Sequence, residues 1–195
     1  MISLEQVKQL RERTGAGVVD AQKALLESGG DLEKAVLVLR KKGQAKALKK
    51  ASRAAAQGII ETYVHAGGQV GVMLELNSET DFVARNEKFK ELAHELALQI
   101  AASDPKVLRP EDVSEAMLAA EREVAEADLK DKPEKIREQA MAGKLKKFAE
   151  SQALLTQPTI KNPDETVGDM ITRYITEIGE NIQVRRFVRY QVGQE

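Results

Sequence analysis

The spacing of apolar side chains changes along this 195-residue chain, and the change limits the folds open to it. In residues 2–42 apolar side chains recur at helical spacing. Residues 58–65 are rich in residues that favour strands, and Val70, Val72, Leu74 and Leu76 occupy every second position, which is typical of a strand with one buried face. Helical spacing returns at 86–103, and alternation returns at 182–192. We therefore predict an α+β fold, in which an N-terminal three-helix bundle precedes a small antiparallel sheet with helices and a projecting helical hairpin.

The N-terminal region is predicted to form three short helices around one small core. Ser3 and Gln6 have the spacing of a capping box at the first helix, and Asp31 can cap the third. Glycines in the turns at 14–17 and 29–30 supply the backbone freedom that sharp turns need. The expected inward side chains are Leu4, Val7, Leu10, Ala21, Ala24, Leu25, Leu32, Ala35, Val36 and Leu39. Three helices of this size with tight turns resemble a ubiquitin-associated-type bundle.

Two domains joined by a linker are predicted from these patterns. Residues 1–42 are the helical bundle, 43–57 a helical linker rich in alanine and lysine, and 58–195 an α+β core or dimerisation domain. Within the core, Gly67 and Gly68 predict a two-residue turn between the first two strands.

Residues 111–150 are predicted to form an antiparallel helical hairpin. Apolar positions in its first helix follow alternating steps of four and three residues, which is a short heptad seam. The seam consists of Val113, Met117, Ala120, Val124 and Ala127. A turn at 130–134 leads into a return helix with inward Ile136, Ala140, Leu145 and Phe148. A helix at 166–178 and a final strand with one apolar face from Ile182 to Val192 complete the predicted fold.

The net charge is −1, but the basic residues are concentrated near the N-terminus. Residues 1–57 hold 12 Lys or Arg against 6 Asp or Glu. The densest run contains Arg40, Lys41, Lys42, Lys46, Lys49, Lys50 and Arg53. Such a run indicates either a contact with RNA or an acidic protein, or a solvated helix face. The second interpretation is favoured, because no aromatic residue that could stack on bases lies between the charges.

The residues needed for covalent catalysis or for holding a cofactor do not form a motif. The chain has no cysteine and two histidines, His65 and His94, and we interpret both as ordinary half-buried side chains. The segment Gly143–Leu145 lacks the Ser or Thr of a phosphate-binding loop. Glu75, Glu79 and Asp81 are interpreted as acids of a solvated loop. We therefore predict no enzyme, no metal and no cofactor.

The sequence also lacks the signs of a membrane or secreted protein. The charged N-terminal segment has no apolar core of a signal peptide, and no run of about 18 apolar residues occurs. The expectation is a soluble protein of the reducing cytoplasm that has no membrane partner.

Three segments together resemble one family, translation elongation factor Ts. They are residues 10–25 (LRERTGAGVVDAQKAL), 75–86 (ELNSETDFVARN) and 178–187 (IGENIQVRRF). Their order and spacing also resemble the family, and the resemblance covers essentially all 195 residues.

The resemblance implies a guanine-nucleotide exchange factor for elongation factor Tu, the GTPase that carries aminoacyl-tRNA. It implies binding to the GDP-bound and nucleotide-free forms of that GTPase, without direct contact to nucleic acid. The implied contact residues are Arg11, Val18 and Val19 in the bundle, the segment Thr80, Asp81, Phe82 and Val83, and Ile178 and Gly179 near the phosphate-binding region. Within the second group, Asp81 and Phe82 are implied to intrude beside the magnesium site. Many members of the family have Met-Met where this chain has Val18-Val19, which keeps an apolar contact but shortens its reach.

The resemblance further implies a homodimer, because longer members carry a duplicated core and this chain has one copy. From the residues alone, Phe82 stands in a polar loop, and exposed aromatic side chains in loops often bind partners. The alternative is that Phe82 packs into its own core.

Two other functions stay open at this point. One is a ubiquitin-associated-type binding module with an attached dimerisation domain, which would leave the segment from Thr80 to Val83 without a role. The other is a ribosome- or RNA-associated protein that acts through the basic run, whose binding would weaken steeply with salt.

Overall fold

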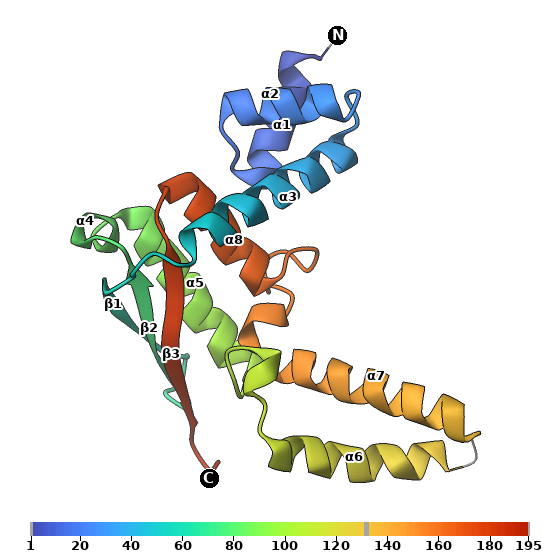
Figure 1. Ribbon diagram of the computed structural model, residues 1–195. Helices are drawn as coiled ribbons and strands as arrows, with labels where there is room; N and C mark the ends of the chain where they lie inside the picture. Colours follow the sequence, from blue (N-terminus) through green and yellow to red (C-terminus); the bar gives the residue numbers. More distant parts are fainter. Residues whose placement is uncertain (1, 131–132, 195) are drawn as a thin grey trace. The chain divides into compact units, whose positions relative to one another are not determined.

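The computed structural model describes residues 2–130 and 133–194, and it has an α+β fold (Figure 1). These residues form eight α-helices, two short 3-10 helices and one three-stranded sheet. The chain divides into two compact units. The first unit is Met1–Thr62, Met73–Glu95 and Asp169–Phe187, and the second is Tyr63–Val72, Leu96–Gly168 and Val188–Glu195. No helix in the described part of the chain is long and apolar enough to cross a membrane.

Three helices form the N-terminal bundle: α1 (Leu4–Thr14), α2 (Val18–Glu27) and α3 (Leu32–Lys50). The predicted capping box at α1 is confirmed, because the Gln6 amide N–H donates to Ser3 Oγ at 3.1 Å while the Ser3 N–H donates to Gln6 Oε1 at 2.9 Å. The buried core consists of Val7, Leu10, Ala21, Ala24, Leu25 and Ala35. Leu4 was predicted to share this core but is exposed, since it occupies the first position of α1, one turn before Val7.

Asp31 caps α3 as predicted, and its carboxylate accepts the Lys34 backbone N–H at 3.0 Å. This hydrogen bond lowers the pKa of Asp31 below its ordinary value, and the Lys34 ammonium adds to the effect. The helix that begins here continues to Lys50, so the third bundle helix and the first part of the predicted 43–57 linker are one helix.

Helix α3 passes close to α8 (Val167–Ile178) within the first unit. Gly43 is buried, and a Cβ atom at this position would lie 3.4 Å from Thr176 Oγ1 and 3.5 Å from Thr172 Cγ2. Arg40 Nε lies 3.8 Å from Asp169 Oδ2, and Lys50 Nζ donates to the Gly179 carbonyl oxygen. Small side chains and polar pairs therefore join the bundle to α8.

The sheet contains β1 (Gln57–Val64), β2 (Val70–Ser78) and β3 (Ile182–Gln191) in the order β1-β2-β3, and it is antiparallel. The turn between β1 and β2 is longer than predicted. Because the His65 N–H donates to the Val70 oxygen at 2.9 Å, four residues rather than two close the hairpin. Gly67 and Gly68 both have left-handed backbone angles, with φ of 88° and 68°.

Glycine is required at Gly58, near the start of β1. Its φ is 152°, and a Cβ atom there would lie 2.2 Å from the Leu76 backbone oxygen and 2.8 Å from Asn77 Cα. Real Cβ atoms do not approach backbone so closely, so the adjacent strand β2 excludes any side chain at this position.

The prediction of one continuous apolar face along β3 is wrong beyond Val184. Ile182 and Val184 are buried, but Val188 and Tyr190 are exposed while Arg189 between them is largely covered. The change of face follows two consecutive exposed residues, Arg185 and Arg186. Two adjacent outward residues in a strand are typical of a β-bulge, which reverses the alternation.

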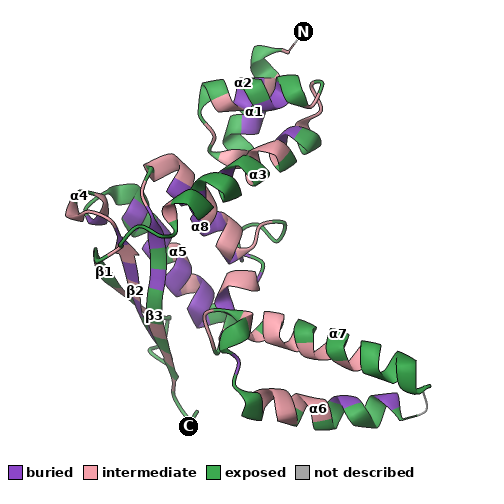
Figure 2. Ribbon diagram, in the orientation of Figure 1, coloured by how far each residue is buried: buried purple, intermediate pink, exposed green. Residues whose placement is uncertain are grey.

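Helix α5 (Glu87–Ser103) supplies much of the core, and its predicted inward face is confirmed (Figure 2). This face is Phe89, Leu92, Ala93, Leu96, Ala97, Ile100 and Ala101. In the first unit the buried face continues through Leu74 and Leu76 of β2 and Ile171 and Tyr174 of α8. Burial raises the pKa of the Tyr174 hydroxyl, and the Glu95 carboxylate raises it further.

In the second unit, α6 (Glu115–Leu129) and α7 (Glu134–Gln152) lie side by side as a hairpin (Figure 1). The predicted seam of α6 is wrong, because its buried residues are Ala125 and Leu129 and Val124 is exposed. Ala125 and Leu129 lie four residues apart on a neighbouring face of the same helix, and this face turns inward. Ile136, predicted inward on α7, is exposed. Part of the predicted turn at 130–134 lies outside the described residues.

Candidate partner-binding site

The segment predicted as a polar loop after β2 contains a single helical turn, α4 (Asp81–Ala84). Thr80 is its N-cap, and its Oγ1 accepts the Val83 N–H at 3.4 Å. Ser78, which is buried at the end of β2, donates from its Oγ to the Thr80 oxygen at 2.9 Å. The loop prediction was therefore wrong in conformation, because hydrogen bonds from both sides fold the segment into a turn.

Phe82 lies on this turn and is 80% exposed, which confirms the expected exposure and contradicts packing in its own core. Ala84 points inward and is buried, whereas Val83 is half-buried. Asp81 Oδ2 accepts from Arg85 Nη2 at 2.9 Å, an ion pair one turn apart along the chain. The turn therefore presents an aromatic ring to solvent beside a carboxylate.

The second predicted contact segment follows α8. Ile178 ends this helix, and Gly179 then adopts a left-handed φ of 93° that turns the chain away. Glu180, the next residue, accepts the Thr80 N–H at 3.0 Å with Oε2 and the Thr80 hydroxyl at 2.7 Å with Oε1. The structure thus brings the predicted segments 80–83 and 178–179 together within the first unit.

Glu180 was missing from the predicted site residues. It belongs to the segment 178–187 that carried the family resemblance, but the sequence contained no sign of its partner, which is 100 residues away. The sequence signal that could have identified Glu180 is an acidic residue directly after a glycine that ends a helix.

The third predicted group, Arg11, Val18 and Val19, lies in the bundle. Val18 and Val19 are exposed in the first turn of α2, and Arg11 Nε donates to the Ala16 oxygen at 3.2 Å across the α1–α2 turn. This hydrogen bond of Arg11 therefore lies within the bundle. The bundle residues of the predicted site are on different elements from α4.

The basic run on and after α3 is largely paired with acidic or carbonyl groups of the same unit. Its partners are Asp169 for Arg40, Glu27 for Lys42 at 2.6 Å, Asp20 for Lys46 at 3.1 Å, the Gly179 oxygen for Lys50, and Glu79 for Arg53 at 3.5 Å. Five of its seven cations therefore have partners within the protein. This pairing favours the interpretation as a solvated helix face over an RNA-binding surface.

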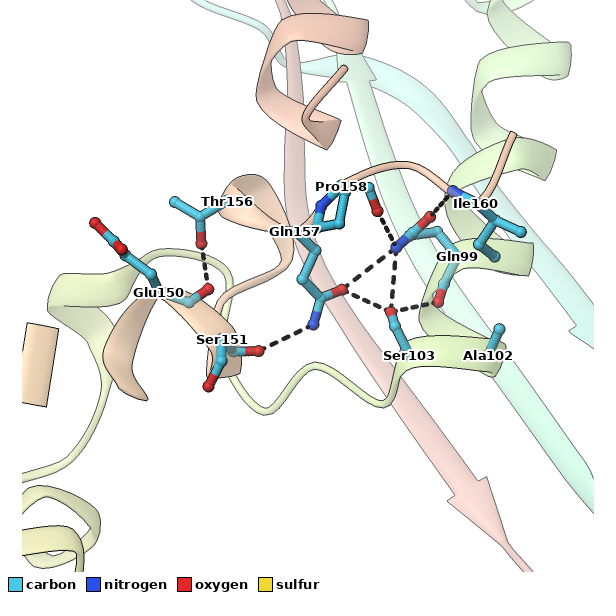
Figure 3. A pocket seen from close by; sticks show the side chains of 9 residues that line it. All are labelled: Gln99, Ala102, Ser103, Glu150, Ser151, Thr156, Gln157, Pro158 and Ile160. Atoms are coloured by element: carbon cyan, nitrogen blue, oxygen red, sulfur yellow. Dashed lines mark hydrogen bonds between the residues drawn. The ribbon is translucent and has the colours of Figure 1, made fainter. Parts of the chain in front are cut away.

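A cavity of about 500 Å³ lies in the second unit, between the C-terminal ends of α5 and α7 (Figure 3). Its polar side chains form hydrogen bonds within the protein: Ser103 Oγ donates to Gln157 Oε1 at 2.6 Å, and Gln99 Nε2 donates to the Pro158 backbone oxygen at 3.2 Å. The cavity therefore presents a satisfied hydrogen-bond network.

Across residues 2–130 and 133–194, no group of three or more His, Cys, Asp or Glu could hold a metal ion.

Comparison with known proteins places this arrangement in a family. The model of the family described as Elongation factor TS matches residues 7–194. Over 196 residues the chain is 52% identical to Elongation factor Ts of Moorella thermoacetica, an alignment that covers all of this chain and 97% of the relative. It is 53% identical over 194 residues to Elongation factor Ts of Thermotoga neapolitana, which covers all of this chain and 98% of the relative. The chain belongs to the elongation factor Ts family.

Proposed function

We propose that this protein is a guanine-nucleotide exchange factor that binds elongation factor Tu and accelerates its release of GDP during translation elongation. The observation that carries the proposal is Phe82, an aromatic ring that is 80% exposed on a capped helical turn. Membership in the elongation factor Ts family supports the same function.

Nucleotide exchange requires no covalent chemistry, so we infer that the protein is not an enzyme in that sense and needs no cofactor. An exchange factor has to bind the nucleotide-free GTPase more tightly than the GDP-bound form. By thermodynamic linkage, it then weakens GDP binding by the same factor. Exposed side chains that compete for the region around the nucleotide are sufficient for this effect.

The two joined segments of the first unit are the proposed exchange surface. Phe82 inserts between structural elements of the GTPase, Asp81 competes for groups near its magnesium ion, and Ile178 and Gly179 approach its phosphate-binding region. Thr80 and Val83 hold the turn that presents Phe82. Full burial of a phenylalanine side chain contributes up to about 3 kcal/mol, which is enough to distort a partner locally.

Residues 1–42 are proposed to be a ubiquitin-associated-type docking domain, with 43–57 as linker and 58–195 as the α+β core and dimerisation domain. Arg11, Val18 and Val19 are its proposed contacts with the GTPase domain. The exposure of both valines on the first turn of α2 supports this assignment.

The protein is further proposed to act as a homodimer. In the second unit, apolar side chains of β1 and of β3 and its continuation are exposed: Val64, Val188, Tyr190 and Val192. Exposed apolar side chains gathered on one sheet favour association with a second apolar surface. As a translation factor, the protein would act in the cytoplasm, without membrane or nucleic-acid partners.

The test is release of a fluorescent GDP analogue from purified elongation factor Tu. Addition of the protein should increase the first-order release rate in proportion to its concentration until the rate saturates. An unchanged release rate would contradict the proposal. Retention of the protein on ribosomal RNA at low salt, without any effect on release, would instead support the RNA-associated alternative.

A further inference from the structure

We propose that Glu180 is a positioning residue that joins the two partner-contacting segments into one tip and holds Phe82 in the orientation required for exchange. The inference rests on the proposed exchange function and adds a residue to it. Glu180 itself does not need to contact the GTPase, since it would act through Thr80 and the turn that Thr80 caps.

The contacts of Glu180 all reach the residues just before α4. Its Oε2 accepts the backbone N–H of Glu79 at 3.1 Å and of Thr80 at 3.0 Å, and its Oε1 accepts the Thr80 hydroxyl at 2.7 Å. One side chain therefore fixes the backbone of two successive residues and the hydroxyl that caps α4. Phe82 follows Thr80 by two positions, so its direction depends on this anchor.

A second link runs parallel to the first. Asn181 is buried, its N–H donates to Glu79 Oε1 at 2.6 Å, and its Nδ2 donates to the Arg53 oxygen at 2.7 Å. Glu79 also pairs with Arg53 Nη1 at 3.5 Å. Segments from three distant parts of the sequence thus meet directly behind α4, and all of them belong to the first unit.

The chemistry of this junction favours a carboxylate over other side chains. Three donors converge on Glu180, and an ionised carboxylate can accept all of them with its two oxygens. Hydrogen bonds to a charged acceptor are roughly twice as strong as neutral ones. A glutamine could keep the two backbone bonds through its single oxygen and donate from its amide to the Thr80 hydroxyl oxygen, whereas an alanine would lose all three bonds.

These differences define the variants. Glu180→Ala should lower the maximal rate of GDP release from elongation factor Tu by about tenfold or more, because it loses three charge-assisted hydrogen bonds and even one of them corresponds to about that factor. The concentration that gives half-maximal rate should change less than threefold, because the bundle contacts are intact. Glu180→Gln should recover most of the rate. Ser114→Ala, which removes the N-cap of α6 in the second unit, is the control for a general loss of stability and should leave the rate unchanged.

A readout that does not depend on exchange is amide hydrogen exchange at Glu79 and Thr80, measured by NMR on the full chain. Both amides should exchange at least about tenfold faster in Glu180→Ala than in the wild type, with protection retained in Glu180→Gln. If the wild type fails to accelerate GDP release, the proposed function is wrong, while the amide measurement still decides whether Glu180 holds the turn.

A double variant separates positioning from a merely structural role. In a Phe82→Ala background, Glu180→Ala should have little further effect on the maximal rate, because it acts through the ring that is already absent. Additive losses, a wild-type rate in Glu180→Ala, or unchanged amide protection would each overturn the proposal.

Discussion

Replacing Phe82 with alanine should reduce nucleotide exchange strongly while hardly changing the stability of the free protein. Full burial of a phenylalanine contributes at most about 3 kcal/mol, so covering the 80% that is exposed contributes about 2 kcal/mol. That free energy corresponds to about 30-fold in an equilibrium constant. We therefore expect Phe82→Ala to lower the efficiency of GDP release by about 30-fold.

The expected small change in the stability of Phe82→Ala follows from the small part of the ring that is buried in the free protein. The covered fifth accounts for about 0.5 kcal/mol of the free energy of unfolding, and the higher helix propensity of alanine offsets a similar amount. The melting temperature should therefore shift by less than about 2 °C. Phe89→Ala is the matched control, because this ring is fully buried in α5, and its removal should cost about 3–5 kcal/mol.

The two quantities are measured on the same preparations, by fluorescent GDP release from elongation factor Tu and by thermal unfolding followed by circular dichroism. Release should be recorded over a range of factor concentrations, so that a change in binding is distinguished from a change in maximal rate. A Phe82→Ala protein that exchanges GDP as fast as the wild type, or that loses several kcal/mol of stability, would refute the reasoning.

Three further predictions concern the fold and its assembly. Gly58→Ala should destabilise the protein by about 3 kcal/mol or more in denaturant unfolding, because its Cβ atom would meet the Leu76 oxygen at 2.2 Å, whereas Gly71→Ala, where no atom lies within 4 Å, should be close to neutral. The lowered pKa of Asp31 means that its contribution to stability is present above the pKa of the unfolded state and is lost as the pH falls through the folded-state pKa. The stability difference between the wild type and Asp31→Asn, which keeps a capping side chain, should therefore shrink in acid below about pH 4, and a constant difference would contradict this. Tyr190→Asp should shift the proposed homodimer toward monomer in light scattering, while Leu48→Asp, an equally exposed position on α3, should leave the mass unchanged.

Features set by neighbours along the chain could be predicted from the sequence. The caps at Ser3 and Asp31 and the inward face of α5 depend on residues at most a few turns apart, and all three are confirmed. The helical turn at Asp81–Ala84 could not be predicted in the same way, because its cap residue Thr80 is held by Glu180, which is 100 positions away.

Two wrong predictions have a different physical origin. In α6 the spacing of apolar residues fits two neighbouring faces, and only packing against another helix selects the one with Ala125 and Leu129. In β3 two consecutive exposed residues follow Val184, and they reverse the alternation that the sequence alone extends to Val192. In α6 the local period was correct and packing determined which face turns inward, whereas in β3 the period itself breaks at Arg185 and Arg186.

Helix α3 is continuous from Leu32 to Lys50, and this continuity affects how docking of the bundle assists binding of the tip that carries Phe82. A 19-residue helix is about 28 Å long, and unlike a flexible tether it has few conformations to lose when both of its ends are engaged. Once the bundle has docked, the tip would search a small volume for its target, which corresponds to a high effective molarity. A glycine-rich insertion after Lys42 would lengthen that search and slow exchange, even if every contact residue were retained.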